Sequence, residues 1–168
     1  MSFNENITKQ VKALSEALLN QEKRLVTAES CTGGLLGGAI TDQAGSSKIY
    51  DRGFIAYSNE AKQQLLGVKA ETLQSYGAVS EQTALEMAVG ALENSQADIS
   101  ISVTGIAGPD SDGDKPVGLV YIACAVKSSL HDGNTAESFP FSLSGNRQEI
   151  REQTLYKALE IARKHLES

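Results

Sequence analysis

The fold of this chain is decided by the stretch Thr27-Ala28-Glu29-Ser30-Cys31-Thr32-Gly33-Gly34. The apolar run Arg24-Leu25-Val26 precedes it and predicts a strand, and Leu35-Leu36-Gly37-Gly38-Ala39-Ile40 follows it and predicts a helix. A turn rich in hydroxyls and glycine at this junction leaves backbone N–H groups unpaired at the positive end of a helix dipole. It also lets a hydroxyl stand clear of the sheet, and we therefore expect Ser30 to act as a nucleophile.

Hydrophobic spacing predicts helices and strands that alternate along the rest of the chain. Helices are predicted over residues 6–20, 33–42, 60–66, 81–95 and 147–166. Strands are predicted over residues 24–28, 54–57, 98–103, 117–126 and 137–143. Helix starts are marked by Ser58 or Asn59, by Ser80, and by Asn146 with Glu149 in the pattern of a capping box. Gly37 and Gly38 weaken their helix by propensity, so we expect it to pack closely on the sheet.

These elements predict a single α/β domain over residues 1–168, with three α/β/α layers and a mixed sheet. Strand 117–126 is nearly all apolar, which predicts cover on both faces. It is joined to strand 137–143 too briefly for a crossover helix, so the two form an antiparallel pair. Pro140 cannot donate to a ladder and places its strand at a sheet edge, where a homodimer or higher homo-oligomer would find a pairing surface.

Composition excludes several classes of protein and of ligand. The net charge of −6 over 168 residues argues against binding to nucleic acid, although one local pocket can still attract a small anion. We find no signal-peptide core and no apolar run near the ~20 residues of a membrane span, and so predict a cytoplasmic protein without a membrane partner. Cys31 and Cys124 lack metal spacing, and free thiols are expected.

We predict neither a metal nor a cofactor. The acidic run Asp110-Ser111-Asp112-Gly113-Asp114 resembles a calcium loop, but Lys115 stands where an EF-hand needs glycine. No cluster of His, Cys and Asp has the spacing of a zinc site.

A serine nucleophile needs a base, and Lys62 is the candidate. His131 lies in a polar loop and His165 near the C-terminus, so a Ser-His-Asp triad is not expected. Lys62 falls in the first turn of a predicted helix, where the dipole disfavours an added positive charge, and burial against Tyr57 or Phe54 would lower its pKa further. An ordinary solvated helix lysine is the competing interpretation.

The turn itself offers a rival nucleophile and several donors. Cys31 shares the helix start with Ser30, and because adjacent side chains point opposite ways only one of them faces a site. N–H groups of Cys31, Thr32, Gly33 and Gly34 would bind an oxyanion or a phosphate, or simply start a helix. Glu29 either shares the acid–base work or holds the turn, and the structural role is favoured slightly.

Further candidates lie at the expected ends of other elements. Thr104 and Gly105 follow a strand at its C-terminal end, where α/β proteins build their sites. Arg147 opens the last helix and would bind a carboxylate or phosphate with its guanidinium, unless it is simply exposed to solvent.

With these residues in place, the chain resembles the CinA C-terminal domain family, the nicotinamide-nucleotide amidohydrolases. The matching segments run in order along almost the whole chain. They are Ala28-Glu29-Ser30-Cys31-Thr32-Gly33-Gly34, Ala44-Gly45-Ser46-Ser47, Arg52-Gly53-Phe54, Tyr57-Ser58-Asn59-Glu60-Ala61-Lys62, Gly77-Ala78-Val79-Ser80, Thr104-Gly105-Ile106-Ala107-Gly108-Pro109, Lys115-Pro116-Val117-Gly118 and Gly145-Asn146-Arg147.

The resemblance implies an α/β/α domain that hydrolyses the carboxamide of nicotinamide mononucleotide to nicotinate mononucleotide and ammonia, in pyridine-nucleotide salvage. The serine and lysine that the family uses fall on Ser30 and Lys62. Tyr57, Thr104 and Arg147 match positions of the substrate pocket, and Thr104 stands where some members have serine. Many members carry a further N-terminal domain similar to molybdopterin-cofactor-binding domains, whereas this chain starts directly at the amidase-like helix.

The mechanism expected from this resemblance uses neutral Lys62 to take the proton of Ser30 as the hydroxyl attacks the carboxamide carbon. Backbone N–H groups of the 32–34 turn hold the oxyanion, or alternatively Gly33 and Gly34 hold the phosphate. Arg147 with Ser46 and Ser47 holds the 5′-phosphate, and Tyr57 stacks on the pyridinium. Asn59 is also taken as a substrate-binding candidate.

Two other functions remain open from the sequence. The domain could bind nucleotides or a protein partner without catalysis, or it could be a general amidase or esterase.

Overall fold

The structure is a computed structural model, and it describes residues 3–127 and 133–167. Its centre is one mixed sheet in the order β2-β1-β3-β4-β5. The strands are β1 (Leu25–Glu29), β2 (Tyr50–Ile55), β3 (Ile99–Gly105), β4 (Leu119–Val126) and β5 (Thr135–Ser142). β1 pairs in parallel with β2 and β3, whereas β4 is antiparallel to β3 and β5. The predicted antiparallel pair is therefore confirmed, and Pro140 lies on the edge strand β5.

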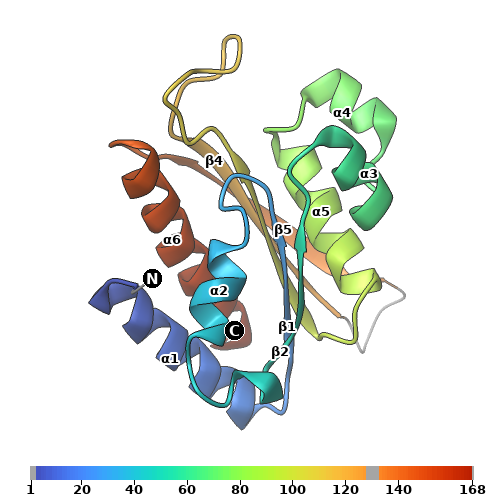
Figure 1. Cartoon of the computed structure of the whole chain (residues 1–168). Coiled ribbons are helices and arrows are strands. Elements are labelled where there is room, and N and C mark those ends of the chain that lie inside the picture. The colour runs from blue at the N-terminus through green and yellow to red at the C-terminus, as the bar shows by residue number, and fades with distance from the viewer. Residues whose placement is uncertain (1–2, 128–132, 168) are drawn as a thin grey trace.

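Helices cover both faces of the sheet and make the three predicted layers (Figure 1). One layer holds α1 (Glu5–Asn20), α2 (Leu35–Thr41) and α6 (Arg147–Glu167). The other holds α3 (Asn59–Leu66), α4 (Ala70–Tyr76) and α5 (Glu81–Glu93), with α5 against the sheet. A short 3-10 helix, η1 (Ser46–Lys48), leads into β2.

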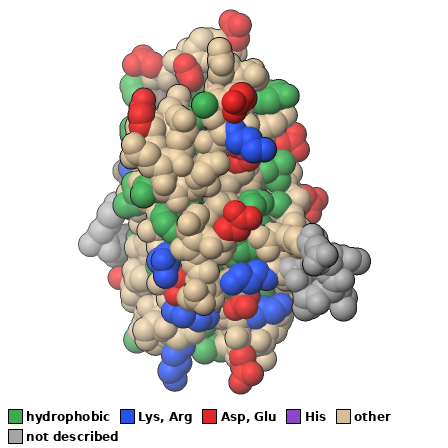
Figure 2. Space-filling view, turned by 90° about the vertical axis from the view of Figure 1, so that its right-hand side faces the viewer, with side chains coloured by type: hydrophobic (Ala, Val, Ile, Leu, Met, Phe, Trp, Pro, Cys, Tyr) green, Lys and Arg blue, Asp and Glu red, His purple; other side chains and the backbone are tan. Residues whose placement is uncertain are grey.

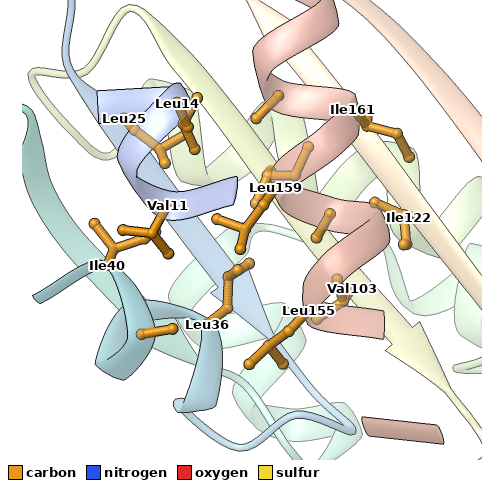
Figure 3. Close-up of a cluster of buried hydrophobic side chains, with 14 of the residues drawn as sticks. Val11, Leu14, Leu25, Leu36, Ile40, Val103, Ile122, Leu155, Leu159 and Ile161 are labelled. Atoms are coloured by element: carbon orange, nitrogen blue, oxygen red, sulfur yellow. The ribbon is translucent and has the colours of Figure 1, made fainter. Parts of the chain in front are cut away.

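Aliphatic side chains fill the space between the sheet and the α1–α2–α6 layer (Figure 3). Val11 and Leu14 of α1 meet Leu155 and Leu159 of α6 in this cluster, and all four are at most 3% exposed. Because β3 alternates, Ile99, Ile101 and Val103 join the same cluster.

The opposite face of β3 carries hydroxyls, and α5 satisfies them. Ser100 Oγ donates to the Ala88 carbonyl at 2.6 Å, and Ser102 Oγ donates to the Ala84 carbonyl at 2.7 Å. Both serines are fully buried, so these bonds offset the cost of removing the hydroxyls from water. They fix α5 on the sheet along its whole inner side.

Most predicted helix starts are confirmed by their hydrogen bonds. Ser58 Oγ accepts from the Ala61 N–H and Ser80 Oγ accepts from the Thr83 N–H. Asn146 and Glu149 bond each other's backbone N–H groups as a capping box does. These caps fix where α3, α5 and α6 begin.

Close packing explains Gly37 but not Gly38. A Cβ on Gly37 would lie 2.5 Å from the hydroxyl of Tyr50, which is hydrogen-bonded to Thr27 Oγ1 at 2.7 Å. Gly38 is exposed, and its nearest neighbour would be Phe3 at 3.8 Å.

The structure departs from the predicted elements in two places. β2 begins at Tyr50 rather than at residue 54, because its first half is a half-exposed edge with polar residues and no apolar alternation. The short helix α4 was not predicted, since its seven residues carry only Leu73 as a buried apolar side chain.

The part of the chain that the structure describes holds no membrane-spanning helix, and one face of the molecule carries charges of both signs. No helix within residues 3–127 and 133–167 is long and apolar enough to cross a bilayer. Figure 2 shows the side of the molecule on which α3, α4 and α5 lie, where acidic and basic side chains are interspersed.

Gly90 in α5 should be the glycine whose replacement costs most inside a helix. A Cβ there would lie 1.8 Å from the Leu66 carbonyl oxygen at the end of α3. We expect Gly90→Ala to lower the free energy of unfolding by about 1–3 kcal/mol through overpacking. Gly38→Ala is the matched control and should be neutral or stabilising by up to ~1 kcal/mol. Urea unfolding of both variants measures this, and a stabilised Gly90→Ala would contradict the packing described.

Candidate active site

A cleft of about 250 Å³ lies at the carboxyl ends of the parallel strands β1 and β3. Seven of the residues that the sequence singled out line it together: Ser30, Cys31, Tyr57, Lys62, Thr104, Gly105 and Arg147. They come from the turn after β1, from the β2–α3 connection and α3, from β3, and from the start of α6 (Figure 1). The fold therefore joins segments more than a hundred residues apart in the chain into one concave surface.

The amine of Lys62 is buried at the base of this cleft and contacts Ser30. Lys62 is 1% exposed, and its Nζ lies 3.0 Å from Ser30 Oγ. The same nitrogen bonds the Ala56 carbonyl at 3.0 Å and the Tyr57 carbonyl at 3.1 Å. No ion pair reaches Lys62 among the described residues. The amine thus lies in a cage of neutral oxygen atoms.

This environment lowers the pKa of Lys62 below its usual value of 10.5. Burial is the main cause, because removal from water disfavours the charged ammonium. A thiolate at Cys31 would act in the opposite direction. However, burial raises the pKa of the Cys31 thiol to about 11, so that neighbour is neutral at neutral pH.

Glu29 holds the turn that presents Ser30. Its buried carboxylate accepts hydrogen bonds from the N–H groups of Gly34, Leu36 and Gly37 at 2.8–3.0 Å. Such a set of donors fixes both the start of α2 and the preceding turn. The contacts agree with the structural role favoured for Glu29 from the sequence.

The same contacts correct the expectation for the two glycines. The Gly34 N–H is bonded to Glu29, and the Gly33 N–H is bonded to the Ser30 carbonyl at 3.1 Å. Neither is available for an oxyanion or a phosphate. Both glycines have positive φ, 60° and 95°, which explains why the turn needs them. Of the four predicted donors, the Cys31 and Thr32 N–H groups remain.

Arg147, Thr104 and Tyr57 reach the cleft in different ways. Arg147 Nη1 donates to the Gly108 carbonyl at 2.6 Å, which leaves other guanidinium N–H groups for a ligand. Thr104 is 1% exposed and donates its hydroxyl to the Ala78 carbonyl at 2.7 Å. Tyr57 is 65% exposed, so its ring is free to contact a ligand.

Six predicted site residues do not line the cleft: Gly33 and Gly34, whose N–H groups are already bonded, and four others. Ser46 and Ser47 belong to η1, at the amino-terminal edge of β2 and thus at the opposite end of the sheet (Figure 1). Asn59 is exposed at the start of α3, and the Thr32 side chain is fully buried without a hydrogen-bond partner for its hydroxyl. The expectation that Ser46 and Ser47 hold a phosphate beside Arg147 is therefore wrong within one chain.

Sequence reasoning missed several residues of this cleft. Ala78 and Val79 line it, yet their segment was noted only as part of the family resemblance. Asp110 and Asp112 also line it, although their loop was considered only as a calcium site. Lys115 joins these two segments, because its Nζ donates to the Tyr76 and Val79 carbonyls at 2.7 and 2.5 Å. No local pattern signals such a contact between distant loops.

Among the described residues, no histidine lines this cleft. Within residues 3–127 and 133–167 no group of three or more His, Cys, Asp or Glu side chains could hold a metal ion. His131 lies outside the described residues. His165 is near the end of α6, where it contacts the Ile161 carbonyl and the ring of Phe139. Cys31 and Cys124 are both buried free thiols.

Comparison with known proteins shows the family of this chain. The model of the CinA C-terminal domain matches residues 7–166. The chain belongs to the CinA C-terminal domain family.

Relatives and solved structures agree with this family. A curated relative from Caldicellulosiruptor bescii is 53% identical over 151 residues, which is 89% of this chain and 35% of the relative. A CinA-like protein of Endomicrobium trichonymphae is 49% identical over 89% of this chain and 34% of its own length. The competence/damage inducible protein CihA from Agrobacterium tumefaciens has a TM-score of 0.92 at 42% identity, covering 100% of this chain and 99% of that structure. This chain thus spans about a third of the curated relatives and the whole of that solved structure.

Burial of the Lys62 amine should make stability depend on pH. The unfolded state holds this proton up to pH 10.5, whereas the folded state loses it at lower pH, so stability rises with pH over that interval. Lys62→Met removes the titrating group. We therefore expect wild type to gain stability relative to Lys62→Met as the pH rises toward 10.5. Urea unfolding over pH 7–10.5 measures this, and a constant difference would mean that the amine stays charged.

Proposed function

We propose that this domain hydrolyses the carboxamide of nicotinamide mononucleotide to nicotinate mononucleotide and ammonia. The observation that carries the proposal is the buried Lys62 amine, 3.0 Å from the hydroxyl of Ser30 in a cleft at the carboxyl end of the sheet. The family resemblance supplies the substrate, and the geometry supports the chemistry. Both are tested below.

The three contacts of Lys62 Nζ suit a neutral amine that acts as a base. A neutral amine has two N–H donors and one lone pair. The Ala56 and Tyr57 carbonyls can accept both hydrogens, which leaves the lone pair for the hydroxyl of Ser30. Once Lys62 takes a proton, the same carbonyls stabilise the ammonium. This arrangement therefore serves both halves of an acid–base cycle.

In the first half-reaction, Ser30 Oγ bonds to the carboxamide carbon as its proton passes to Lys62 Nζ. The C–N bond then breaks, and Lys62 returns the proton to the leaving nitrogen, which departs as ammonia. In the second half-reaction, water attacks the acyl-serine with Lys62 as the base. The ester bond to Ser30 breaks and the carboxylate product leaves, with the proton returned to Oγ. No external reductant or oxidant is needed.

The charges along the cleft suit a substrate that carries both signs. Arg147 can bind the 5′-phosphate through a charge-assisted fork. Tyr57 can stack on the pyridinium, and the carboxylates of Asp110 and Asp112 favour the same positive charge. We extend the proposal to a role in pyridine-nucleotide salvage in the cytoplasm, while a homo-oligomer stays a prediction.

Ammonia release tests the nucleophile and the base. With nicotinamide mononucleotide as substrate, we expect Ser30→Ala and Lys62→Met to lower kcat by at least ~10³-fold, because each removes a member of one catalytic unit. Cys31→Ala should keep most of its activity, since that thiol is protonated at neutral pH. Loss in Cys31→Ala alone would overturn the assignment of Ser30. Binding without ammonia from wild type would instead indicate a non-catalytic nucleotide-binding module.

The role of Arg147 can be separated from the chemical step. Arg147→Gln should raise KM for nicotinamide mononucleotide roughly 10- to 100-fold, the loss of one charge-assisted contact, with a small effect on kcat. Nicotinamide riboside lacks the phosphate, so its kcat/KM should be nearly unchanged by this substitution. Equal losses of kcat/KM on both substrates would show that Arg147 does not act by binding the phosphate.

A further inference from the structure

Ala78 and Val79 line the cleft together with Ser30 and Lys62, and other side chains hold the carbonyls of the 76–79 loop. Lys115 Nζ donates to the Tyr76 carbonyl at 2.7 Å and to the Val79 carbonyl at 2.5 Å. Thr104 Oγ1 donates to the Ala78 carbonyl at 2.7 Å. The Gly77 carbonyl accepts hydrogen bonds as well. The four consecutive carbonyls of residues 76–79 are therefore all held.

The bonds to Gly77 come from two hydroxyls. Thr83 Oγ1 donates to the Gly77 carbonyl at 2.7 Å, and Ser80 Oγ donates to it at 3.0 Å. These donors lie on β3, on the 110–116 loop, at the N-cap of α5 and in its first turn. This set of bonds fixes the backbone from the end of α4 through residues 77–79, which have no regular structure of their own.

Fixing a carbonyl also fixes the N–H of the same peptide unit. These peptide bonds are trans, so each N–H points away from its own carbonyl. The Ala78 N–H thus points away from the start of α5, and the Val79 N–H points away from Thr104. Within residues 3–127 and 133–167 neither N–H donates a hydrogen bond to the protein. Both residues line the cleft.

We propose that the Ala78 and Val79 N–H groups bind the carboxamide oxygen of the substrate. Thr104 is the positioning residue that aims the Val79 N–H through the Ala78 carbonyl, and Lys115 is a positioning residue that braces the two flanking peptide units through the Tyr76 and Val79 carbonyls. This inference rests on the proposed function, because it names the groups that recognise the bond to be cut. These donors take the place of the Gly33 and Gly34 N–H groups, which are already bonded, whereas the Cys31 and Thr32 N–H groups of that turn remain the competing donors. Donors held in advance stabilise charge that develops on the oxygen.

Lys115 gives the sharpest variants. Lys115→Met removes both bonds to the loop, whereas Lys115→Arg keeps a charged donor. We expect Lys115→Met to lower kcat at least tenfold with a smaller change in KM, because the contact strengthens as the oxyanion forms. Lys115→Arg should stay within a few-fold of wild type. Lys69→Met is the matched control, since it removes a lysine beside α4 whose Nζ makes no hydrogen bond or ion pair in the described part of the chain.

A second readout does not depend on turnover. In the Ser30→Ala background, nicotinamide is titrated as a simple carboxamide probe while the backbone amide signals of residues 31, 32, 78 and 79 are followed by NMR. Shifts at Ala78 and Val79 that disappear on Lys115→Met support the inference. Shifts confined to Cys31 and Thr32, or none at all, overturn it.

The two readouts keep the inference and the proposed function distinguishable. One outcome is that ammonia release requires Ser30 and Lys62 and yet is unchanged by Lys115→Met. That result would support the proposed hydrolysis and contradict the role of the 76–79 loop. Shifts at Ala78 and Val79 without ammonia from wild type would leave a carboxamide-binding loop in a protein that does not hydrolyse nicotinamide mononucleotide.

Discussion

The structure depends on one buried amine. Lysine is rarely buried because an ammonium loses its hydration, yet Lys62 is 1% exposed at the base of the cleft. Its surroundings offer two backbone carbonyls and one hydroxyl but no carboxylate among the described residues. A carboxylate would hold the amine in its charged form, whereas neutral oxygens let burial lower its pKa. The chain therefore buries an amine of lowered pKa beside a hydroxyl.

The rest of the fold keeps the partners of that amine in register. Parallel pairing of β1 with β2 brings Ser30, just after β1, beside the β2–α3 connection that supplies the two carbonyls. The Glu29 carboxylate fixes the turn by accepting hydrogen bonds from three backbone N–H groups. From the last helix, Arg147 bonds Gly108, and Arg151 bonds the Thr32 carbonyl at 2.9 Å. Loops without regular structure are thus held by side chains from distant segments, which lets them form a rigid cleft.

Sequence reasoning reached the layers and the mixed sheet, because these rest on local periodicity. Ser30 and Lys62 were candidates from their places at the ends of elements, and the family resemblance joined them as a pair. The strand and helix that flank Ser30 predict its place in the turn at the carboxyl end of β1, and a lysine in the first turn of a helix predicts a lowered pKa. Placement of Ser46 and Ser47 failed, because a loop that precedes a parallel strand lies at the opposite end from the one that follows it.

Contacts between distant loops were also beyond the sequence. Nothing near Lys115 in the chain indicates that its amine reaches the Val79 carbonyl, and Thr104 was expected to touch the substrate rather than the Ala78 carbonyl. Donors at Gly33 and Gly34 were expected to be free, because the sequence could not show that Glu29 turns back onto its own helix start.

The charge state of Lys62 can be measured directly. Lysines labelled with ¹³C at Cε report protonation through their chemical shifts, and the signal of Lys62 is assigned by its absence from Lys62→Met. We predict that this signal titrates at lower pH than the lysine signals as a group, and that it shows a neutral amine while they are still charged. A Lys62 signal that titrates together with the others would contradict the account, because the amine could then not accept the proton of Ser30.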